Sequence, residues 1–491
     1  MITTHPFERT TDGIDDDKLR EECGVFGIYG FADAAAHTAL GLHALQHRGQ
    51  EAAGIVAYDG QQFNAHRDLG LVGDIFSSER VMKRLVGHSA IGHVRYSTTG
   101  ETVLRNVQPL FAHLQFGGFT LAHNGNLTNA SALHRQLAQR GSLFQTTSDT
   151  EVIVHLMAMS GAGSMIDRLI DALRQIEGAY SLVALTDSCV IGVRDPLGVR
   201  PLVIGRLGNT YIVASETCAL DIIGAHYVRE VEAGEMVVLD DSGIHSLRPF
   251  PPARQRFCVF EYIYFSRPDS VVDGTSVYER RKQIGAELAR ESGIDADVVI
   301  PVPDSGVPAA IGYAEESRIP FELGIIRNHY VGRTFIEPSQ QIRNLGVRLK
   351  HNANRAALTG KRVILVDDSI VRGTTSIKIV EMVRAAGATA VHMRIAAPPT
   401  AHPCFYGIDT PEPSELLASK MDVAAMAKHI GVDSLAFISM DGLYRAMGEA
   451  GRDADRPQFC DACFTGEYPT HLTDHGDTDN PAQLSLLAEL A

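Results

Sequence analysis

The sequence contains no apolar run that approaches the roughly 18 residues of a membrane-spanning helix, so a membrane protein is not expected. The first 22 residues are polar and include Asp15, Asp16 and Asp17. They therefore lack the apolar core of a secretory signal and the acid-poor, arginine-rich character of a transit peptide. Cysteine is scarce, with 7 in 491 residues, which does not fit a secreted disulfide framework. These absences predict a cytoplasmic protein.

Positive charge is also in short supply. Lys and Arg total 44 against 59 Asp and Glu, which gives a net charge of −15. This balance argues against non-specific binding to nucleic acid or to an anionic membrane, while a local basic site stays compatible with it. The 45% hydrophobic and 21% charged residues are typical of a globular protein, and the length predicts two or three domains.

The most informative stretch runs from Val363 to Thr375 and reads VILVDDSIVRGTT. Its apolar run predicts a strand that ends in Asp367 and Asp368; a loop with Gly373 follows, and a helical pattern begins by Ser376. In an open parallel sheet, ligands bind beyond the carboxyl ends of the strands, and a helix N-terminus offers free N–H groups to a phosphate. Paired carboxylates favour a phosphorylated sugar, because they accept hydrogen bonds from its hydroxyls. The alternative is a buried strand with an ordinary polar turn.

This loop lacks the G-x-x-x-x-G-K-[ST] spacing of a Walker A motif. It resembles the 5-phosphoribosyl-1-pyrophosphate (PRPP) loop of type I phosphoribosyltransferases, in which the paired acids contact the ribose hydroxyls and the loop holds the 5′-phosphate. The PRPP residues implied by this resemblance are Asp367, Asp368, Ser369, Arg372, Gly373, Thr374 and Thr375.

A second predicted strand, Val298–Val302, ends in a polar turn that contains Ser305. The resemblance implies that this turn reaches the pyrophosphate, so that Ser305 joins Asp367 and Asp368 near one Mg²⁺ per subunit. Mg²⁺ prefers oxygen ligands, few of them from protein.

Residues 327–350 are basic in an acidic chain. A solvated loop is one interpretation, and a lid that closes over PRPP and excludes water is the other. The resemblance implies lid contacts from Arg333 and Lys350. The sequence has Arg327 and His329 where the family is expected to have Lys and Arg, so the charge is kept at the first position and weakened at the second.

The first half of the chain predicts a strand that opens at Cys23, a helix over 36–45 and a strand over 54–58. Polar or glycine-rich segments lie between strand-like runs and are predicted as turns, where functional groups tend to sit on a rigid scaffold. These segments are His47–Glu51, His93–Gly100, His123–Asn126, Thr146–Glu151 and Arg194–Leu202.

Together these segments resemble the glutaminase domain of N-terminal-nucleophile (Ntn) amidotransferases, whose fold is a four-layer αββα sandwich. The resemblance implies that Arg95 holds the α-carboxylate of glutamine, that Asp149 holds its α-amino group, and that Asn124 and Gly125 form the oxyanion hole. Arg48, Gly49 and Thr98 are implied as supporting residues of the glutamine site. The alternatives are a surface arginine at Arg95 and a type I′ hairpin turn at Asn124-Gly125.

The chemistry of Cys23 explains why it would stand first in a mature chain. A thiol is mostly protonated at neutral pH and needs a base. A free α-amino group has a pKa of about 7.7–8.0 and lies on the same residue, so Cys23 would need no histidine partner. This holds only if the Glu22–Cys23 bond is cut, which predicts that residues 1–22 are a propeptide. The alternative is a buried cysteine that opens a strand.

Four further cysteines form a candidate metal site: Cys258, Cys404, Cys460 and Cys463. Cys460 and Cys463 form a C-x-x-C pair, which is compatible with zinc, redox chemistry or an iron–sulfur cluster. Four thiolates would satisfy a [4Fe–4S] cluster and equally a structural Zn²⁺ site. Resemblance favours the cluster, because one branch of the amidophosphoribosyltransferases combines a [4Fe–4S] cluster of this distribution with a propeptide.

The expected fold class is thus α/β and α+β: an Ntn sandwich followed by a phosphoribosyltransferase domain with a mostly parallel sheet flanked by helices. The expected boundaries are a propeptide at 1–22, a glutaminase domain at 23–250, a phosphoribosyltransferase domain with iron–sulfur ligands at 251–468 and a loose polar tail at 469–491. Residues 257–268 are predicted as an apolar, strand-like part of the core.

The function implied by the resemblance is glutamine-dependent amidophosphoribosyl transfer. Glutamine would be hydrolysed at Cys23, and the ammonia would displace pyrophosphate from PRPP to give 5-phosphoribosylamine, the first committed step of de novo purine synthesis. Purine nucleotide feedback inhibitors and a homotetramer are implied as well. A hexosamine-phosphate synthase would leave residues 363–375 unexplained, a PRPP-sensing regulator would need a DNA-binding arm, and a catalytically dead paralogue conflicts with the intact Cys23, Arg95, Asn124 and Asp149.

Overall fold

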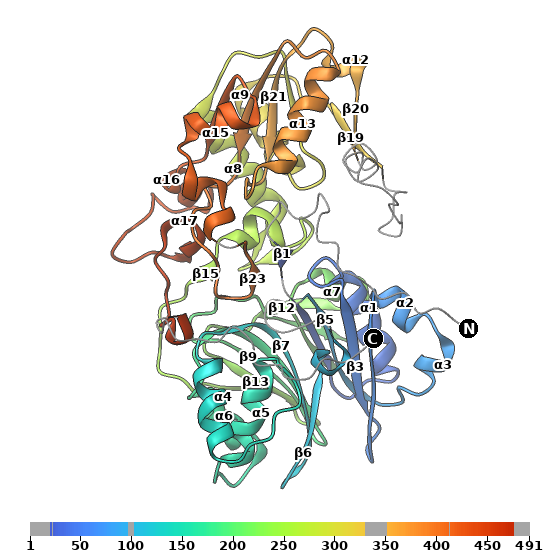
Figure 1. Ribbon diagram of the computed structural model, residues 1–491. Coiled ribbons are helices and arrows are strands. Elements are labelled where there is room, and N and C mark those ends of the chain that lie inside the picture. The colour runs from blue at the N-terminus through green and yellow to red at the C-terminus, as the bar shows by residue number, and fades with distance from the viewer. Residues whose placement is uncertain (1–19, 22, 97–102, 329–350, 412, 476–491) are drawn as a thin grey trace, which may run out of the picture.

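The computed structural model describes residues 20–21, 23–96, 103–328, 351–411 and 413–475 (Figure 1). An antiparallel two-sheet unit forms the first half of the chain, and a parallel-sheet unit forms the second. Within these residues, no helix combines the length and the apolar character that crossing a membrane requires.

The first unit contains two antiparallel sheets. The seven-stranded sheet has the order β12-β10-β11-β2-β5-β3-β4, and the six-stranded sheet has the order β14-β13-β9-β8-β7-β6. The strands of the first sheet are β2 (Gly24–Ile28), β3 (Ala52–Tyr58), β4 (Phe63–Leu69), β5 (Ser89–Arg95), β10 (Val203–Leu207), β11 (Thr210–Ala214) and β12 (His226–Glu230). Those of the second are β6 (Leu110–Leu114), β7 (Gly117–Leu127), β8 (Gly178–Thr186), β9 (Val190–Arg194), β13 (Met236–Asp240) and β14 (Gly243–Leu247).

The two sheets pack face to face over a shared apolar core that includes Val25, Val56 and Ile91 from the first sheet and Val183 from the second. Gly27 on β2 permits this close approach, because a Cβ there would lie 2.6 Å from Val183 Cγ1. Helices cover the two outer faces, each over its own core, so the layers run α, β, β, α (Figure 1). This confirms the expected sandwich. The helices are α1 (Ala34–Ala44), α2 (Val72–Phe76), α3 (Glu79–Met82) and α7 (Cys218–Asp221) on one side, and α4 (Ala130–Gln139), α5 (Thr150–Met159) and α6 (Met165–Leu173) on the other.

The second unit is built on a four-stranded sheet of order β18-β21-β22-β24, in which all pairings are parallel. This confirms the expected parallel sheet with flanking helices. Its strands are β18 (Val298–Pro301), β21 (Arg362–Asp367), β22 (Ala390–Ile395) and β24 (Ser434–Phe437). Its helices are α8 (Val277–Ser292), α9 (Val307–Ser317), α12 (Arg355–Leu358), α13 (Thr374–Ala385), α14 (Leu417–Lys420), α15 (Val423–Ile430), α16 (Met440–Ala446) and α17 (Ala462–Thr465).

Short strands and turns complete the fold. Paired two- or three-residue strands are β1 (Arg20–Glu21) with β23 (Ile408–Asp409), β15 (Phe257–Cys258) with β25 (Phe459–Cys460), β16 (Val271–Val272) with β17 (Thr275–Ser276), and β19 (Ile325–Arg327) with β20 (His351–Ala353). Single helical turns are η2 (Leu104–Asn106), η3 (Glu261–Phe265), η4 (Pro413–Glu415) and η5 (Thr473–His475).

Three local predictions were wrong. Residues 123–126 are not a turn but the interior of β7, paired residue by residue with β8. The strand predicted over 257–268 stops after Cys258 and gives way to the π-helical turn η3, although its apolar side chains are buried as expected. Residues 469–475 are not loose, because they pack on the first unit: Thr128 Oγ1 donates to the His471 carbonyl at 2.7 Å. Residues 476–491 lie outside the described residues.

Candidate functional site

Cys23 directly precedes β2, near the middle of the seven-stranded sheet, and is 7% exposed. Its backbone N–H donates to the Arg48 carbonyl at 3.0 Å, and its Sγ lies 3.7 Å from the Tyr96 carbonyl oxygen. Both reactive groups of Cys23, the nitrogen and the sulfur, are therefore held by neighbouring backbone.

Arg95 ends β5, the strand next to β2, and its side chain is buried, donating to the Asn106 carbonyl at 3.2 Å. It is therefore not a surface arginine. Gly49 packs against the backbone of this strand, because a Cβ there would lie 2.6 Å from the Arg95 nitrogen. Only glycine permits that approach, which places Arg48, Gly49 and Arg95 around Cys23.

Asn124 and Gly125 lie side by side on β7 of the facing sheet. The Asn124 amide is fully buried, and neither its oxygen nor its nitrogen has a hydrogen-bond partner among the described residues. An unpartnered buried amide is costly, so it suits a group whose partner arrives with the substrate. Gly125 has a φ of 143°, and a Cβ there would lie 2.1 Å from the Ala179 carbonyl oxygen, so no other residue fits.

Asp149 stands at the start of α5, beside the end of β7, where its carboxylate accepts a hydrogen bond from the Leu127 N–H at 3.0 Å. Burial alone would raise the pKa of Asp149, but His123, that N–H group and Arg95 together hold it below its usual value. The carboxylate therefore stays ionised and remains in electrostatic contact with Arg95. An anionic and a cationic side chain in one buried place suit an α-amino acid.

Two buried histidines on the facing strands were not assigned a role from the sequence. His93 Nε2 lies 3.1 Å from the His123 carbonyl oxygen, and His123 Nδ1 lies 3.1 Å from Thr150 Oγ1. Burial lowers the pKa of His93 to about 3, so its ring is neutral. The only feature of the sequence that could have indicated a role for these histidines is their position next to the Arg95 and Asn124 motifs.

Asp367 ends β21, Asp368 follows it directly, and both are almost fully buried. Asp367 accepts a hydrogen bond from the Asp368 N–H at 2.9 Å, and Ser369 Oγ donates to the Asp368 carboxylate at 2.6 Å. The predicted strand and acid pair are therefore present. Carboxylate and hydroxyl oxygens at this strand end are donors that suit Mg²⁺.

Helix α13 follows the acid pair, with Gly373 as its N-cap residue at φ 82°. A Cβ at Gly373 would lie 2.8 Å from Leu417 Cδ2, so both its conformation and its surroundings require glycine. Thr374 opens the helix and is exposed, while Arg372 forms an ion pair with Glu415 at 3.1 Å. The free N–H groups at this helix start are a ready phosphate site.

The turn with Ser305 lies against the same strand. The Val302 N–H donates to the Val366 carbonyl at 2.8 Å, and a Cβ at Gly306 would lie 2.5 Å from that same oxygen. Arg327, the first residue of the predicted lid, forms an ion pair with Asp304 in this turn. Thr98, Arg333, Lys350 and His329 lie outside the described residues, as does most of the predicted propeptide.

Cys258, Cys404, Cys460 and Cys463 come together from three separate parts of the chain. Cys258 and Cys460 are paired partners on β15 and β25, and none of the four forms a disulfide within the described residues. Burial, and after it the charges of Cys258, Cys404 and Cys460, raises the pKa of Cys463. No group of three or more His, Cys, Asp or Glu side chains in the described ranges is arranged to hold a metal ion.

Comparison with known proteins finds a matching domain family in each half of the chain. Residues 93–221 match a glutamine amidotransferase domain, and residues 271–402 match a phosphoribosyl transferase domain. The amidophosphoribosyltransferase of Rhizobium etli is 59% identical over 99% of each chain, and that of Bacillus subtilis is 53% identical over 92% of this chain and 95% of the relative. A chloroplastic amidophosphoribosyltransferase of Arabidopsis thaliana is 52% identical over 96% of this chain and 82% of the relative.

Among solved structures, the glutamine PRPP amidotransferase of B. subtilis in complex with ADP and GMP superposes with a TM-score of 0.87. The two chains are 52% identical, and the match covers 92% of this chain and 98% of the other. Identity at this level over nearly the whole length includes both units and the segment that joins them. The chain therefore belongs to the amidophosphoribosyltransferase family.

Proposed function

We propose that this protein is a glutamine-dependent amidophosphoribosyltransferase. It hydrolyses glutamine to glutamate and ammonia at Cys23 and transfers the ammonia to PRPP, which gives 5-phosphoribosylamine and pyrophosphate, the first committed step of de novo purine synthesis. One observation carries the proposal: a single chain holds a buried thiol beside Arg95 and Asp149, and a buried acid pair that leads into a glycine-capped helix.

In the glutaminase half-reaction, the free α-amino group of Cys23 takes the thiol proton, and the thiolate attacks the carboxamide carbon of glutamine. Arg95 and Asp149 orient the substrate, and the Asn124 amide and the Gly125 N–H donate to the oxyanion. The C–N bond then breaks and the amine returns its proton to the leaving ammonia. Water hydrolyses the γ-glutamyl thioester and releases glutamate.

In the transferase half-reaction, Asp367 and Asp368 accept hydrogen bonds from the ribose hydroxyls, and the start of α13 binds the 5′-phosphate. Ser305 and the acid pair would hold Mg²⁺, which neutralises charge on the pyrophosphate leaving group when it is bound. The nitrogen of ammonia forms a bond to C1 as the bond from C1 to the pyrophosphate oxygen breaks. A closed, apolar passage would keep ammonia unprotonated on its way between the sites.

Removal of residues 1–22 is part of the proposal, because the mechanism needs a free amine on Cys23. Its backbone supports this, since Cys23 has a φ of 75° in the uncut chain, a region that non-glycine residues rarely adopt. Hydrolysis of the Glu22–Cys23 bond would release that strain. Mass spectrometry of active protein checks this step, and full activity with Met1 still attached would refute it.

The four converging cysteines would supply the thiolate ligands of a [4Fe–4S] cluster, which the likeness to the family favours over a structural Zn²⁺. Because its ligands come from three parts of the chain, the cluster would act as a structural staple.

The remaining parts of the proposal rest on the family. They are domain boundaries near residues 250 and 468, a homotetramer, a cytoplasmic location, and feedback inhibition by purine nucleotides. The relative whose solved structure contains ADP and GMP supports the last of these.

The experiment measures pyrophosphate release from PRPP with Mg²⁺, using either glutamine or ammonium at high pH as nitrogen donor. Wild type and Cys23→Ala are prepared without oxygen. Wild type is expected to use both donors and the variant only ammonium. If neither protein releases pyrophosphate with either donor, the transferase assignment fails.

A further inference from the structure

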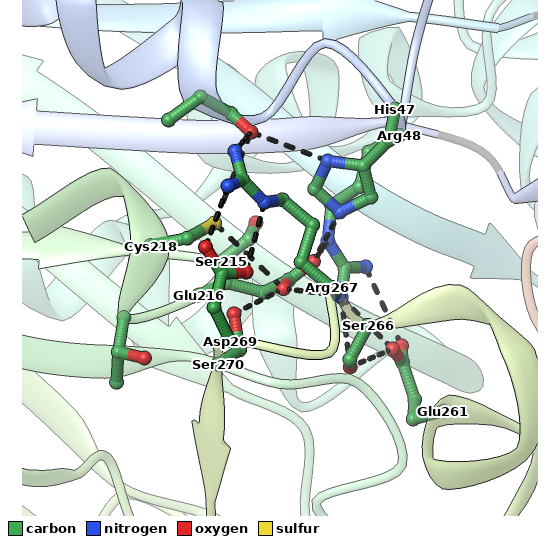
Figure 2. A network of polar contacts seen from close by, with 12 residues as sticks. His47, Arg48, Ser215, Glu216, Cys218, Glu261, Ser266, Arg267, Asp269 and Ser270 are labelled. Carbon is green, nitrogen blue, oxygen red and sulfur yellow. Dashed lines mark hydrogen bonds and ion pairs between the residues drawn. The ribbon is translucent and has the colours of Figure 1, made fainter. Parts of the chain in front are cut away.

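A buried network of ionic side chains lies between the two units of the chain (Figure 2), and one of its members, Arg48, accepts a backbone hydrogen bond from Cys23. Arg48 stands between two carboxylates, Glu216 and Glu261, and all three side chains are fully buried. Glu216 precedes α7 in the first unit, whereas Glu261 opens η3 in the second. The network therefore joins the units by buried ion pairs.

The network begins at the nucleophile. The nitrogen that would be the catalytic amine after cleavage is the donor to the Arg48 carbonyl at 3.0 Å. A free amine keeps N–H groups with which to donate to the same oxygen, and this contact would fix the direction of its lone pair. The position of the Arg48 backbone therefore affects the orientation of the amine relative to the Cys23 thiol.

The Arg48 side chain is in turn fixed from both units. Its Nε contacts Glu216, and its Nη2 donates to Glu261 at 2.8 Å. Burial alone would raise the pKa of Glu216, but Arg48 and His47 hold it well below its usual range, so the carboxylate is charged. On the far side, Ser266 Oγ donates to Glu261 at 2.7 Å.

Glu261 has a second cationic partner in the first unit, because Arg200 Nη2 lies 3.2 Å from its carboxylate. The Glu261 carboxylate of the second unit thus forms ion pairs with two buried arginines of the first unit. Removal of such a charge leaves its partners uncompensated in a place without water.

The same network extends to α8. Arg281 on this helix donates to the Tyr262 carbonyl at 2.8 Å and to the Ser266 carbonyl at 2.7 Å, so it holds both ends of η3, the turn that carries Glu261.

We infer that Glu261, a residue of the transferase unit, is a positioning residue for the glutaminase reaction. It acts through Arg48 on the orientation of the Cys23 amine and does not touch glutamine. The inference rests on the proposed function, since it assigns a role to that same site.

The test compares full-length wild type with Glu261→Gln, which keeps the size of the side chain and removes its charge. Glu261→Asp restores the charge on a shorter side chain. The matched control is Glu235→Gln, because Glu235 is also fully buried but pairs with Arg229 of the first unit, at 2.8 Å. Glutamine hydrolysis is measured against pH with and without PRPP and Mg²⁺, and ammonia-dependent pyrophosphate release is measured in parallel.

For Glu261→Gln, the kcat of glutamine hydrolysis is expected to fall about 10-fold to 100-fold, because small misplacements of a catalytic group cost this much. The KM for glutamine should stay unchanged, since Arg95 and Asp149 remain in place. The limb of the pH profile that reports the amine should shift. Ammonia-dependent release should stay within about 2-fold of wild type, and Glu261→Asp should recover part of the lost kcat.

Two results would overturn the inference. One is a Glu261→Gln protein with the kcat and pH profile of wild type. The other is a parallel loss of both activities and of thermal stability, which would mean that Glu261 is merely structural. Failure of the proposed function is distinguishable from both, because wild type itself would then release no pyrophosphate.

Discussion

The backbone of Gly125 is tightly constrained at the glutamine site, and no residue other than glycine fits there. Its φ of 143° and its close approach to the Ala179 carbonyl both require glycine. On the other side it touches the second unit, because a Cβ on Gly407 would lie 2.9 Å from the Gly125 Cα. The N–H group proposed for the oxyanion hole is therefore fixed by backbone from both units.

We predict that Gly125→Ala lowers glutamine hydrolysis at least about 100-fold, which is the loss typical of removing one oxyanion donor. Ammonia-dependent pyrophosphate release should be retained, and this activity also reports that the variant is folded. The control is Gly141→Ala, since Gly141 has a φ of 94° but nothing within 4 Å of its Cβ position. Equal losses in the two variants would mean that backbone strain alone, and not the position at the site, causes the effect.

Glu230 makes the stability of the folded protein depend on pH, and the direction of this dependence follows from its raised pKa. It is buried beside Asp273, whose N–H donates to it at 3.0 Å, and burial raises the pKa of Glu230 from about 4.5 to about 7. The folded protein therefore binds this proton more tightly than the unfolded chain does. Its stabilising effect is complete below pH 4.5 and is lost as the pH rises through 7.

We predict that Glu230→Gln removes this dependence and raises the free energy of unfolding at pH 8 by roughly 1–3 kcal/mol over wild type. Urea unfolding at pH 5 and at pH 8 measures the difference. Glu232→Gln is the control, because the Glu232 side chain is 64% exposed. A Glu230→Gln protein that is no more stable than wild type at pH 8 would contradict the prediction.

At the scale of elements, the pattern of the sequence predicted those that depend on local residues. The apolar run before Asp367 predicted β21, and the glycine-containing loop predicted the start of α13. Residues 123–126 were assigned to a turn because Asn-Gly favours one, but pairing with β8 keeps them extended. The strand expected after Cys258 becomes η3, where Glu261 reaches arginines of the first unit. In both places a contact distant in sequence overrides the local preference.

The segment 469–475 is a third element whose structure depends on a contact distant in sequence. Its polar composition predicted a loose tail, but it caps a helix. The Asp474 carboxylate accepts hydrogen bonds from the Ser131 N–H at 2.7 Å and from the Ala132 N–H at 3.0 Å. These groups lie in the first turn of α4, which otherwise has no side-chain cap. A residue near the end of the chain thus caps a helix of the first unit.

We predict that Asp474→Ala lowers the free energy of unfolding by about 0.5–2 kcal/mol, the usual effect of losing an N-cap side chain. Urea unfolding checks the value. Asp455→Ala is the control, because it removes an exposed carboxylate for which no side-chain hydrogen bond is formed within the described residues. Unchanged stability in Asp474→Ala would mean that water replaces the cap.

At the scale of the whole molecule, buried ion pairs join the two units, and converging cysteines join separate segments of the second unit. Arg48 and Glu261 are 213 residues apart, and no local pattern in the sequence relates them. The cysteine site could be predicted, because the C-x-x-C pair is a recognisable metal-binding motif and the resemblance to the family implied the other two ligands. The sequence therefore predicted the fold and the reacting groups, but not the side chains that connect the two sites.

The cysteine site predicts what metal removal does to the molecule. Cys258 follows the linker between the units, Cys404 lies close to the Asn126–Phe405 contact with β7, and Cys460 and Cys463 begin the segment that ends at Asp474. Anaerobically purified wild type should contain about four irons per chain, with visible absorbance typical of a cluster. Cys463→Ser should lose the iron, the absorbance and both activities, and its residues 404–475 should become sensitive to protease.

The control is Cys218→Ser, because Cys218 is also buried and free but lies in the first unit, away from the four. It should keep the iron and the ammonia-dependent activity. If wild type contains one zinc per chain and no iron, the site binds the alternative metal, and its proposed role as a structural staple still holds. A Cys463→Ser protein that keeps both activities and resists protease would refute the staple itself, since packing alone would then hold the C-terminal segment on the second unit.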